Sequence, residues 1–155
     1  MSLTTVQPGM VQQLAPANMP SGSVVQTVYG SDATTYSTSG SGITTSTLAF
    51  TLLNASNKVA FFIQIYGSAS IGSTVPGFGL ALNRSGSSIS PTTWAYVTTS
   101  NGQPNQIWVT VPIMYLDTPG TTTPSYTLSL GKASGGGTTT AYQLNANWII
   151  QEIKV

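Results

Sequence analysis

The stretch Gln106–Gly120, QIWVTVPIMYLDTPG, decides the fold class of this chain. Every odd-numbered residue from Ile107 to Tyr115 is apolar, whereas the even-numbered residues mix polar and apolar types, and this two-residue period is typical of a β-strand. The odd-numbered face is therefore predicted to be core. Because the other face is only half polar, we predict a central strand that is covered on both faces. Pro112 has no N–H to donate, so a β-bulge or an unpaired N–H side is expected there.

Alternating patterns recur along the rest of the chain and are separated by turn residues. A tight turn at 54–57 predicts a hairpin between its two flanking strands. With no convincing helix and about eight strands, the chain is predicted to be an all-β, antiparallel β-sandwich of jelly-roll type, and a closed barrel is the alternative. The further predicted strands are 23–29, 46–53, 58–66, 77–84, 94–99, 125–130 and 139–155, the last as one bent strand or two.

The 155 residues are expected to form one β-sandwich domain, residues 23–155, behind a short extended N-terminal arm, residues 1–22. The arm holds three of the nine prolines and shows no sustained period. An arm with apolar side chains needs a surface to lie on, and the alternative is a mobile tail. The apolar side chains in question are Val6, Met10, Val11 and Leu14.

Charge is scarce in this sequence and excludes several kinds of partner. Only 5% of residues are charged, the formal net charge is +1, and the four basic residues form no cluster that would neutralise a row of phosphates. We therefore expect no nucleic-acid partner. No apolar run approaches the length of a membrane helix, so no membrane insertion is expected, and the N-terminus does not read as a signal peptide.

The residue types present also argue against catalysis. The chain contains neither His nor Cys, which removes the Ser-His-Asp triad, thiolate metal sites and the commonest general base. Asp32, Asp117 and Glu152 are scattered along the sequence and match neither a glycosidase pair nor a calcium loop. We expect no enzyme activity, no metal and no cofactor.

Aromatic side chains beside amides are the remaining candidates for ligand binding. The aromatic residues Trp94, Tyr96, Trp108 and Trp148 fall within strand patterns, which favours packing in the core or between subunits. Loop residues are better placed for contact with a sugar. Those candidates are Tyr36, Asn83, Arg84 and Asn101.

Five segments, taken in order, resemble a β-sandwich module of tailed-bacteriophage virion proteins. They are PSGSVVQTVY (20–29), SNKV (56–59), NRSGS (83–87), YLDTP with TPSYT (115–127) and IQEIKV (150–155). The resemblance implies a module of the kind found at the distal ends of tail fibres and tailspikes, or on capsids as a cement (decoration) protein, usually as a homotrimer. It brings no catalytic residue with it.

The residues that precede the module favour a position on the capsid over one on the tail. A tail fibre carries its tip on a coiled coil or a short repeat, whereas here an arm of some twenty residues precedes the module directly. Our hypothesis is therefore a homotrimeric capsid cement protein on the outer surface of the virion, whose arm docks on the phage major capsid protein. The alternative is a tail tip or head-exposed adhesin that binds host-surface glycans. Trp108, Met114 and Leu116 are the predicted subunit interface.

Overall fold

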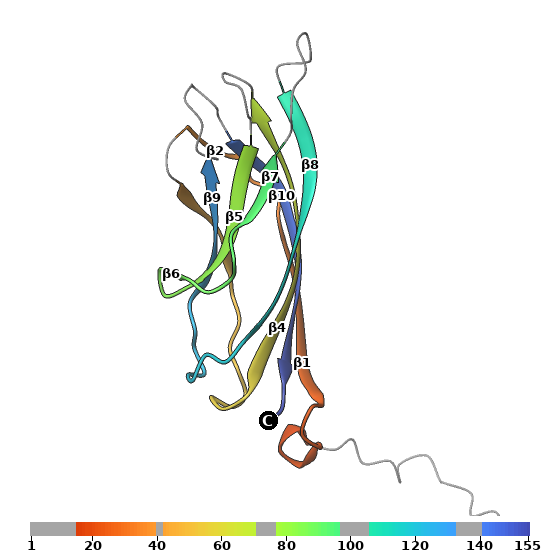
Figure 1. The fold of residues 1–155 in the computed structure, drawn as a ribbon. Coiled ribbons are helices and arrows are strands. Elements are labelled where there is room, and N and C mark those ends of the chain that lie inside the picture. Colours follow the sequence, from red (N-terminus) through yellow and green to blue (C-terminus); the bar gives the residue numbers. More distant parts are fainter. Residues whose placement is uncertain (1–14, 40–41, 71–76, 97–105, 133–140) are drawn as a thin grey trace, which may run out of the picture.

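The computed structural model describes residues 15–39, 42–70, 77–96, 106–132 and 141–155, which form two antiparallel sheets packed face to face (Figure 1). A short 3-10 helix, η1 (Pro16–Asn18), precedes them. Sheet A consists of β1 (Val24–Asp32), β2 (Tyr36–Thr38), β4 (Lys58–Ser70), β8 (Gln106–Asp117) and β10 (Ala141–Ile153). Sheet B consists of β3 (Ile43–Leu48), β5 (Gly77–Arg84), β6 (Ser87–Ser88), β7 (Thr93–Tyr96) and β9 (Tyr126–Lys132).

The strand order is that of a jelly roll. Sheet A runs β1-β10-β4-β8 with β2 beside β10, and sheet B runs β3-β9-β5 with β6 and β7 both beside β5. Without the short β2 and β6, eight strands remain, which can be counted from first to eighth along the chain. Neighbouring strands are then first, eighth, third and sixth in sheet A, and second, seventh, fourth and fifth in sheet B. This is the arrangement of two interlocked Greek keys, which confirms the predicted jelly-roll sandwich of about eight strands.

The core lies between the sheets and is built from alternate residues of their strands. Phe61 on β4 meets Tyr126 on β9 edge to face, with ring centroids 4.7 Å apart, so this pair joins the two sheets directly. On β8, Val111 and Ile113 are buried in the core, as the odd-numbered pattern predicted. The other large members of the core are Leu48, Phe50, Leu52, Val59, Ile63, Ile65, Leu80, Leu82, Leu128, Leu130, Trp148 and Ile150.

The prediction of a central, doubly covered strand at Gln106–Gly120 is wrong. Among the described strands β8 pairs with β4 alone, so it is an edge strand of sheet A. Its register with β4 is continuous from Asp117 to Gln106, with Pro112 opposite Gln64 and no bulge. An edge strand has one unpaired side, which is where a residue without an N–H is tolerated. Alternation identifies the face that is buried, but it does not give the number of neighbouring strands.

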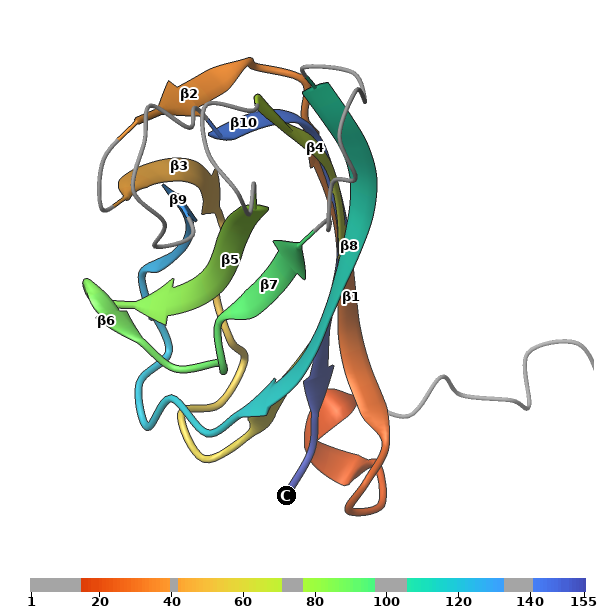
Figure 2. The same ribbon diagram turned by 45° about the horizontal axis from the view of Figure 1, so that its top comes forward.

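The predicted hairpin between residues 46–53 and 58–66 is also wrong. β3 ends at Leu48 and pairs with β9 in sheet B, whereas β4 lies in sheet A, so residues 49–57 cross between the layers (Figure 2). Phe50 and Leu52 are nevertheless buried, because the crossing closes the lower end of the core. The alternation of buried residues therefore continues past Leu48, where β3 ends, and for this reason the sequence pattern predicts a longer strand.

The crossing is held by the fully buried side chain of Glu152 on β10. The backbone N–H of Leu53 donates to both carboxylate oxygens at 2.9 Å, and the N–H of Asn54 donates to Oε1 at 3.1 Å. Asn57 Nδ2 donates to Oε1 at 2.7 Å. The Gln26 amide, oriented with its nitrogen toward these acceptors, donates to Glu152 Oε2 at 2.9 Å and to the carbonyl of Thr51 at 3.1 Å. One carboxylate thus satisfies donors from the crossing and from β1.

Glu152→Gln should destabilise the fold by about 2–3 kcal/mol, because an amide offers one acceptor oxygen and turns an NH₂ group toward buried donors. The free energy of unfolding in urea measures this effect. Asp32→Asn is the matched control: Asp32 is only partly buried and makes fewer contacts, so its cost should stay below about 1 kcal/mol. Equal costs for the two variants would show that Glu152 does not hold the crossing.

Candidate interaction surface on the outer face of sheet A

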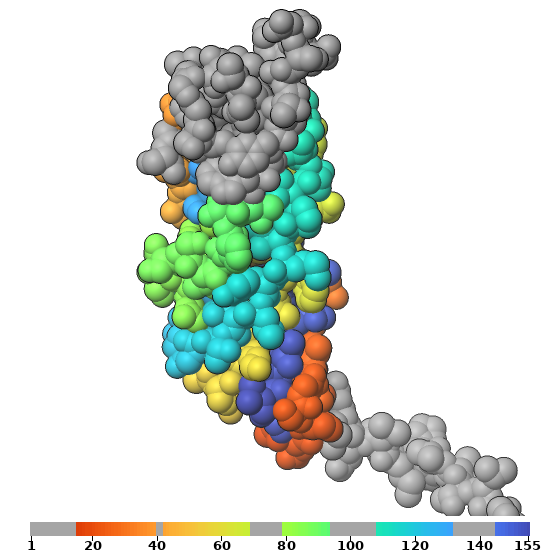
Figure 3. Space-filling model, viewed as in Figure 1, coloured from red at the N-terminus to blue at the C-terminus, as the bar shows by residue number. Residues whose placement is uncertain are grey.

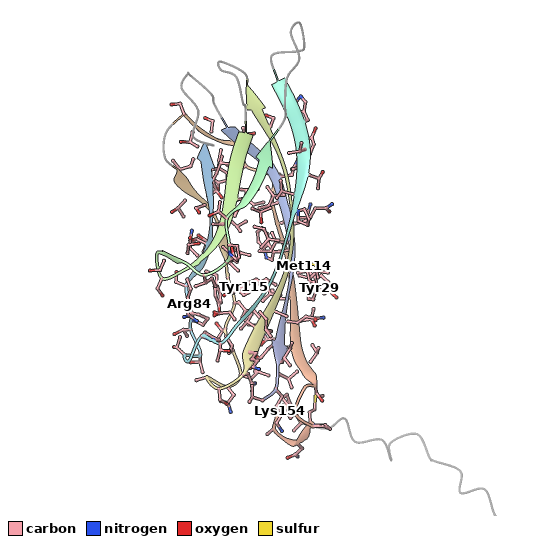
Figure 4. All side chains as sticks on the ribbon, viewed as in Figure 1. Tyr29, Arg84, Met114, Tyr115 and Lys154 are labelled. Atoms are coloured by element: carbon pink, nitrogen blue, oxygen red, sulfur yellow. The ribbon has the colours of Figure 1, made fainter. Side chains whose placement is uncertain are left out.

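An apolar row of side chains crosses the whole outer face of sheet A. Tyr29 on β1 pairs with Ile149 on β10, Ile149 pairs with Phe62 on β4, and Phe62 pairs with Met114 on β8. Figure 4 shows Tyr29 and Met114 on the side of the sheet that faces away from sheet B, whereas Tyr115 points between the sheets. The exposed fractions across the row are 74%, 37%, 40% and 73%. The row is therefore part of the surface, and its two ends protrude most.

The row borders a shallow hollow of about 500 Å³ and is flanked by uncharged side chains. The next row on one side consists of Ser31, Asn147, Gln64 and Pro112, and on the other side of Thr27, Gln151, Ala60 and Leu116. Further along β8, Trp108 stacks on Tyr66 with ring centroids 5.6 Å apart. None of these side chains is charged. A contiguous apolar surface of this kind, without charge, is typical of a protein interaction site.

Gly30 lets β1 lie close beside β10 behind this row. It pairs with Trp148, and a Cβ atom on Gly30 would come within 2.2 Å of the indole Nε1. The indole therefore occupies the space beside Gly30, and Trp148 is itself buried in the core, in agreement with the packing role predicted for it. The absence of a side chain at Gly30 thus allows β1 to pair with β10 next to Tyr29, the β1 end of the row.

The three predicted interface residues lie together on this surface. Trp108, Met114 and Leu116 all occur on β8, and each is exposed. Their role in a subunit interface stays a prediction. Sequence reasoning missed Tyr29 and Ile149 as members of the same surface, because the register that aligns them with Met114 across four strands is a property of the folded sheet. Phe62 carried a signal, since it breaks the polar face of its own strand.

The predicted glycan contacts are not brought together by the described residues. Tyr36 lies on β2 and Arg84 at the end of β5, toward opposite ends of the sandwich (Figures 1 and 4). Asn83 is buried, and Asn101 lies outside the described residues. The Tyr36 hydroxyl donates to Asp32 Oδ2 at 3.0 Å. A glycan site at these four positions therefore stays a prediction. Tyr36, Asn83 and Arg84, the three of them that the structure describes, line no common pocket.

Asp32 fixes the turn between β1 and β2. The N–H of Thr34 donates to Asp32 Oδ1 at 2.8 Å, while the other oxygen accepts from Tyr36. Partial burial raises the pKa of Asp32, but hydrogen bonds from Thr34, Ser46 and Tyr36 outweigh burial and lower the pKa below its ordinary value. These contacts give the carboxylate a structural role.

Arg84 joins the two sheets through an ion pair with Asp117. Its Nη1 donates to both oxygens of Asp117 on β8 at 2.8 Å and to the carbonyl of Thr118 at 3.1 Å. The Tyr126 hydroxyl donates to Asp117 Oδ2 at 2.7 Å. Burial, and then the hydrogen bond to Asp117, raise the pKa of Tyr126 well above its ordinary value. Asp117 thus holds β5 and β9 against β8.

The three carboxylates do not form a shared site. Asp117 and Glu152 lie in one row of sheet A on either side of Val59, but each accepts hydrogen bonds from its own set of donors. The described residues contain no group of three or more His, Cys, Asp or Glu side chains that could hold a metal ion. Within the same part of the chain, no helix has the length and apolar character needed to cross a membrane.

The root of the N-terminal arm is attached to the C-terminal end of β10. Lys154 Nζ donates to the carbonyls of Ala17 and Met19, and the N–H of Gly22 donates to the carbonyl of Lys154 at 2.8 Å. Figure 3 shows these two ends of the described chain in contact at the lower end of the molecule. The predicted docking residues Val6, Met10, Val11 and Leu14 lie outside the described residues.

Comparison with known proteins yields a likeness of fold. No family model matches the chain, and no curated protein does. Among solved structures, a chain of infectious bursal disease virus Gx strain aligns with a TM-score of 0.50 at 14% identity, over 85% of this chain and 33% of that one. Chains of T=1 particles derived from the same virus (TM-score 0.49, 15% identity, 99% and 36% covered) and of its VP2 subviral particle (0.47, 15%, 83% and 32%) are also similar. This chain thus spans about a third of those chains, and the likeness is one of fold.

Alkaline pH should destabilise the protein through Tyr126. In the unfolded chain a tyrosine ionises near pH 10.0, whereas the folded structure keeps Tyr126 neutral, so this contribution to stability is complete below pH 10 and declines as the pH rises above it. We expect a loss of up to about 1 kcal/mol in unfolding free energy between pH 10 and 11, and a smaller loss in Tyr126→Phe. Urea titrations at each pH measure it. A loss in Tyr126→Phe as large as that of the wild type would contradict this assignment.

Proposed function

We propose that this chain is a non-enzymatic structural protein of a virion, and more particularly a homotrimeric capsid cement (decoration) protein of a tailed bacteriophage. In this role it binds the outer face of the major capsid protein lattice and reinforces the head. The observation that carries the proposal is the uncharged apolar row Tyr29–Ile149–Phe62–Met114, because a protein with 5% charged residues and an exposed apolar sheet face is suited to assembly.

The attachment of residues 17–19, where the predicted arm joins the sandwich, supports one orientation of the module on the capsid. Lys154 holds Ala17 and Met19 at the lower end, where the crossing 49–57 also lies (Figure 1). The strand ends that precede and follow residues 71–76, 97–105 and 133–140 are all at the upper end (Figure 1), where Ser70 pairs with Gln106, Gly77 with Tyr96, Lys132 with Phe78 and Ala141 with Ala69. An arm that docks on a coat protein would therefore turn the lower end toward the capsid and the upper end outward.

The fold likeness and the sequence resemblance support the same role independently. The aligned chains belong to virus or subviral particles, and the likeness to the Gx strain chain reaches a TM-score of 0.50 at 14% identity. The five sequence segments resemble phage virion modules in which no catalytic residue is present. On the described part of the chain, the carboxylates and Arg84 are engaged in contacts that hold the fold.

Replacement of Val6, Met10, Val11 and Leu14 by Ser should abolish binding of the purified chain to capsids that lack it, because the arm loses its apolar contacts. Co-sedimentation with such capsids measures binding, and the melting temperature should not change. The matched control replaces the polar arm residues Gln7, Gln12 and Gln13 by Ser and should bind like the wild type. Cryo-electron microscopy of purified virions is the decisive observation, since density for this chain at the tail alone would contradict the cement role.

A further inference from the structure

We infer that copies of this chain associate through the outer face of sheet A, with Tyr29 of one copy packed against Met114 of the next. The inference rests on the self-association that belongs to the proposed function. It goes beyond the β8 residues Trp108, Met114 and Leu116, because it makes β1, at the opposite edge of the sheet, the other half of the contact.

The exposure of the row is explained by such a contact. Tyr29 and Met114 are the two most exposed large hydrophobic side chains of the described residues, and they lie at opposite ends of one row, on the two edge strands. In a closed ring, the β1 edge of each copy lies beside the β8 edge of the next copy. Tyr29 and Met114, which have no further described strand beside them in their own sheet, would then each contact the adjacent copy. Around a three-fold axis this contact occurs three times.

The absence of charge favours a second copy as the partner. The row and the two rows beside it contain no Asp, Glu, Lys or Arg, so the β1 end of one face meets the β8 end of another without repulsion between like charges. A charged ligand or a charged protein surface would find no complementary group on this face. A copy of the chain brings an apolar row of the same composition, together with amides that can pair with amides at Gln64 and Asn147.

The size of the face is adequate for a stable contact. Three strand spacings of about 4.8 Å, with half a spacing beyond each edge strand, make it about 19 Å wide, and the rise from Trp108 to Leu116 makes it about 27 Å long, which gives a projected area of about 500 Å². Upright side chains raise the accessible area above the projection, toward the roughly 800 Å² per partner of a standard interface.

A disulfide introduced between positions 29 and 114 tests the contact in the full-length chain. The sequence contains no Cys, so the double variant Tyr29→Cys/Met114→Cys has only the two introduced thiols. Within one copy these positions are separated by three strand spacings, about 14 Å, which is too far for a disulfide. Mild oxidation of dilute protein should therefore give covalent trimers on a non-reducing gel, whereas each single variant should stay uncrosslinked.

The possible results separate this inference from the proposed function. Uncrosslinked protein, in a double variant that is trimeric by sedimentation, overturns the inference and leaves the trimer intact. Covalent species limited to two copies support the Tyr29–Met114 contact but contradict three-fold symmetry. A wild-type chain that is monomeric at all concentrations overturns both the contact and the trimer, whereas loss of capsid binding alone concerns only the cement role.

A charge placed on the face provides a second measurement. Met114→Lys should weaken self-association at least ten-fold in sedimentation velocity, because Lys would be buried against an apolar neighbour. Leu53→Lys is the matched control, since Leu53 is also exposed but lies on the crossing, outside this face, and should change association less than two-fold. Thermal melts establish that both variants are folded. Equal association by the two variants would overturn the inference.

Discussion

Two buried carboxylates hold the lower end of the sandwich, and the topology depends on them. A jelly roll requires the chain to cross between its sheets, and a crossing leaves backbone N–H groups without strand partners. Glu152 accepts from Leu53, Asn54 and Asn57 in one crossing. Asp117, at the start of the other, accepts from Arg84 and Tyr126 of sheet B. The N–H of Leu52 then donates to the carbonyl of Thr122 at 2.8 Å and links the two crossings.

This arrangement separates the stabilising contacts from the surface that is available for assembly. Five charged side chains, at or near strand ends, make hydrogen bonds inside one subunit: Asp32, Arg84, Asp117, Glu152 and Lys154. The row Tyr29–Ile149–Phe62–Met114 and the two rows beside it, on the outer face of sheet A, consist of amides, hydroxyls and apolar side chains. A neutral face of this kind costs little to desolvate when it is covered, because no ion loses its hydration. Low overall charge and the apolar row on sheet A are therefore both consistent with the proposed role in assembly.

Much of the fold followed from local patterns. The strands Gly77–Arg84 and Gln106–Asp117 lie where alternation placed them, and Val111 and Ile113 are in the core as predicted. The hairpin at residues 54–57 was wrong because the turn joins strands of different sheets, and a turn signal specifies a reversal without naming the partner strand. The exposed apolar surface was predicted only on β8, because its continuation to Tyr29 and Ile149 depends on the pairing of segments more than a hundred residues apart in the sequence.

The sequence by itself determined the all-β class and the buried face of most strands, because side-chain direction alternates within each strand regardless of its neighbours, and it favoured a jelly-roll sandwich over a closed barrel. Only the tertiary structure decided that β8 is an edge strand, that Arg84 pairs with Asp117 while Asn83 is buried, and that Tyr29 and Met114 end one continuous row. The physical reason is that strand order and register arise from hydrogen bonds and packing between distant segments, which no local period records.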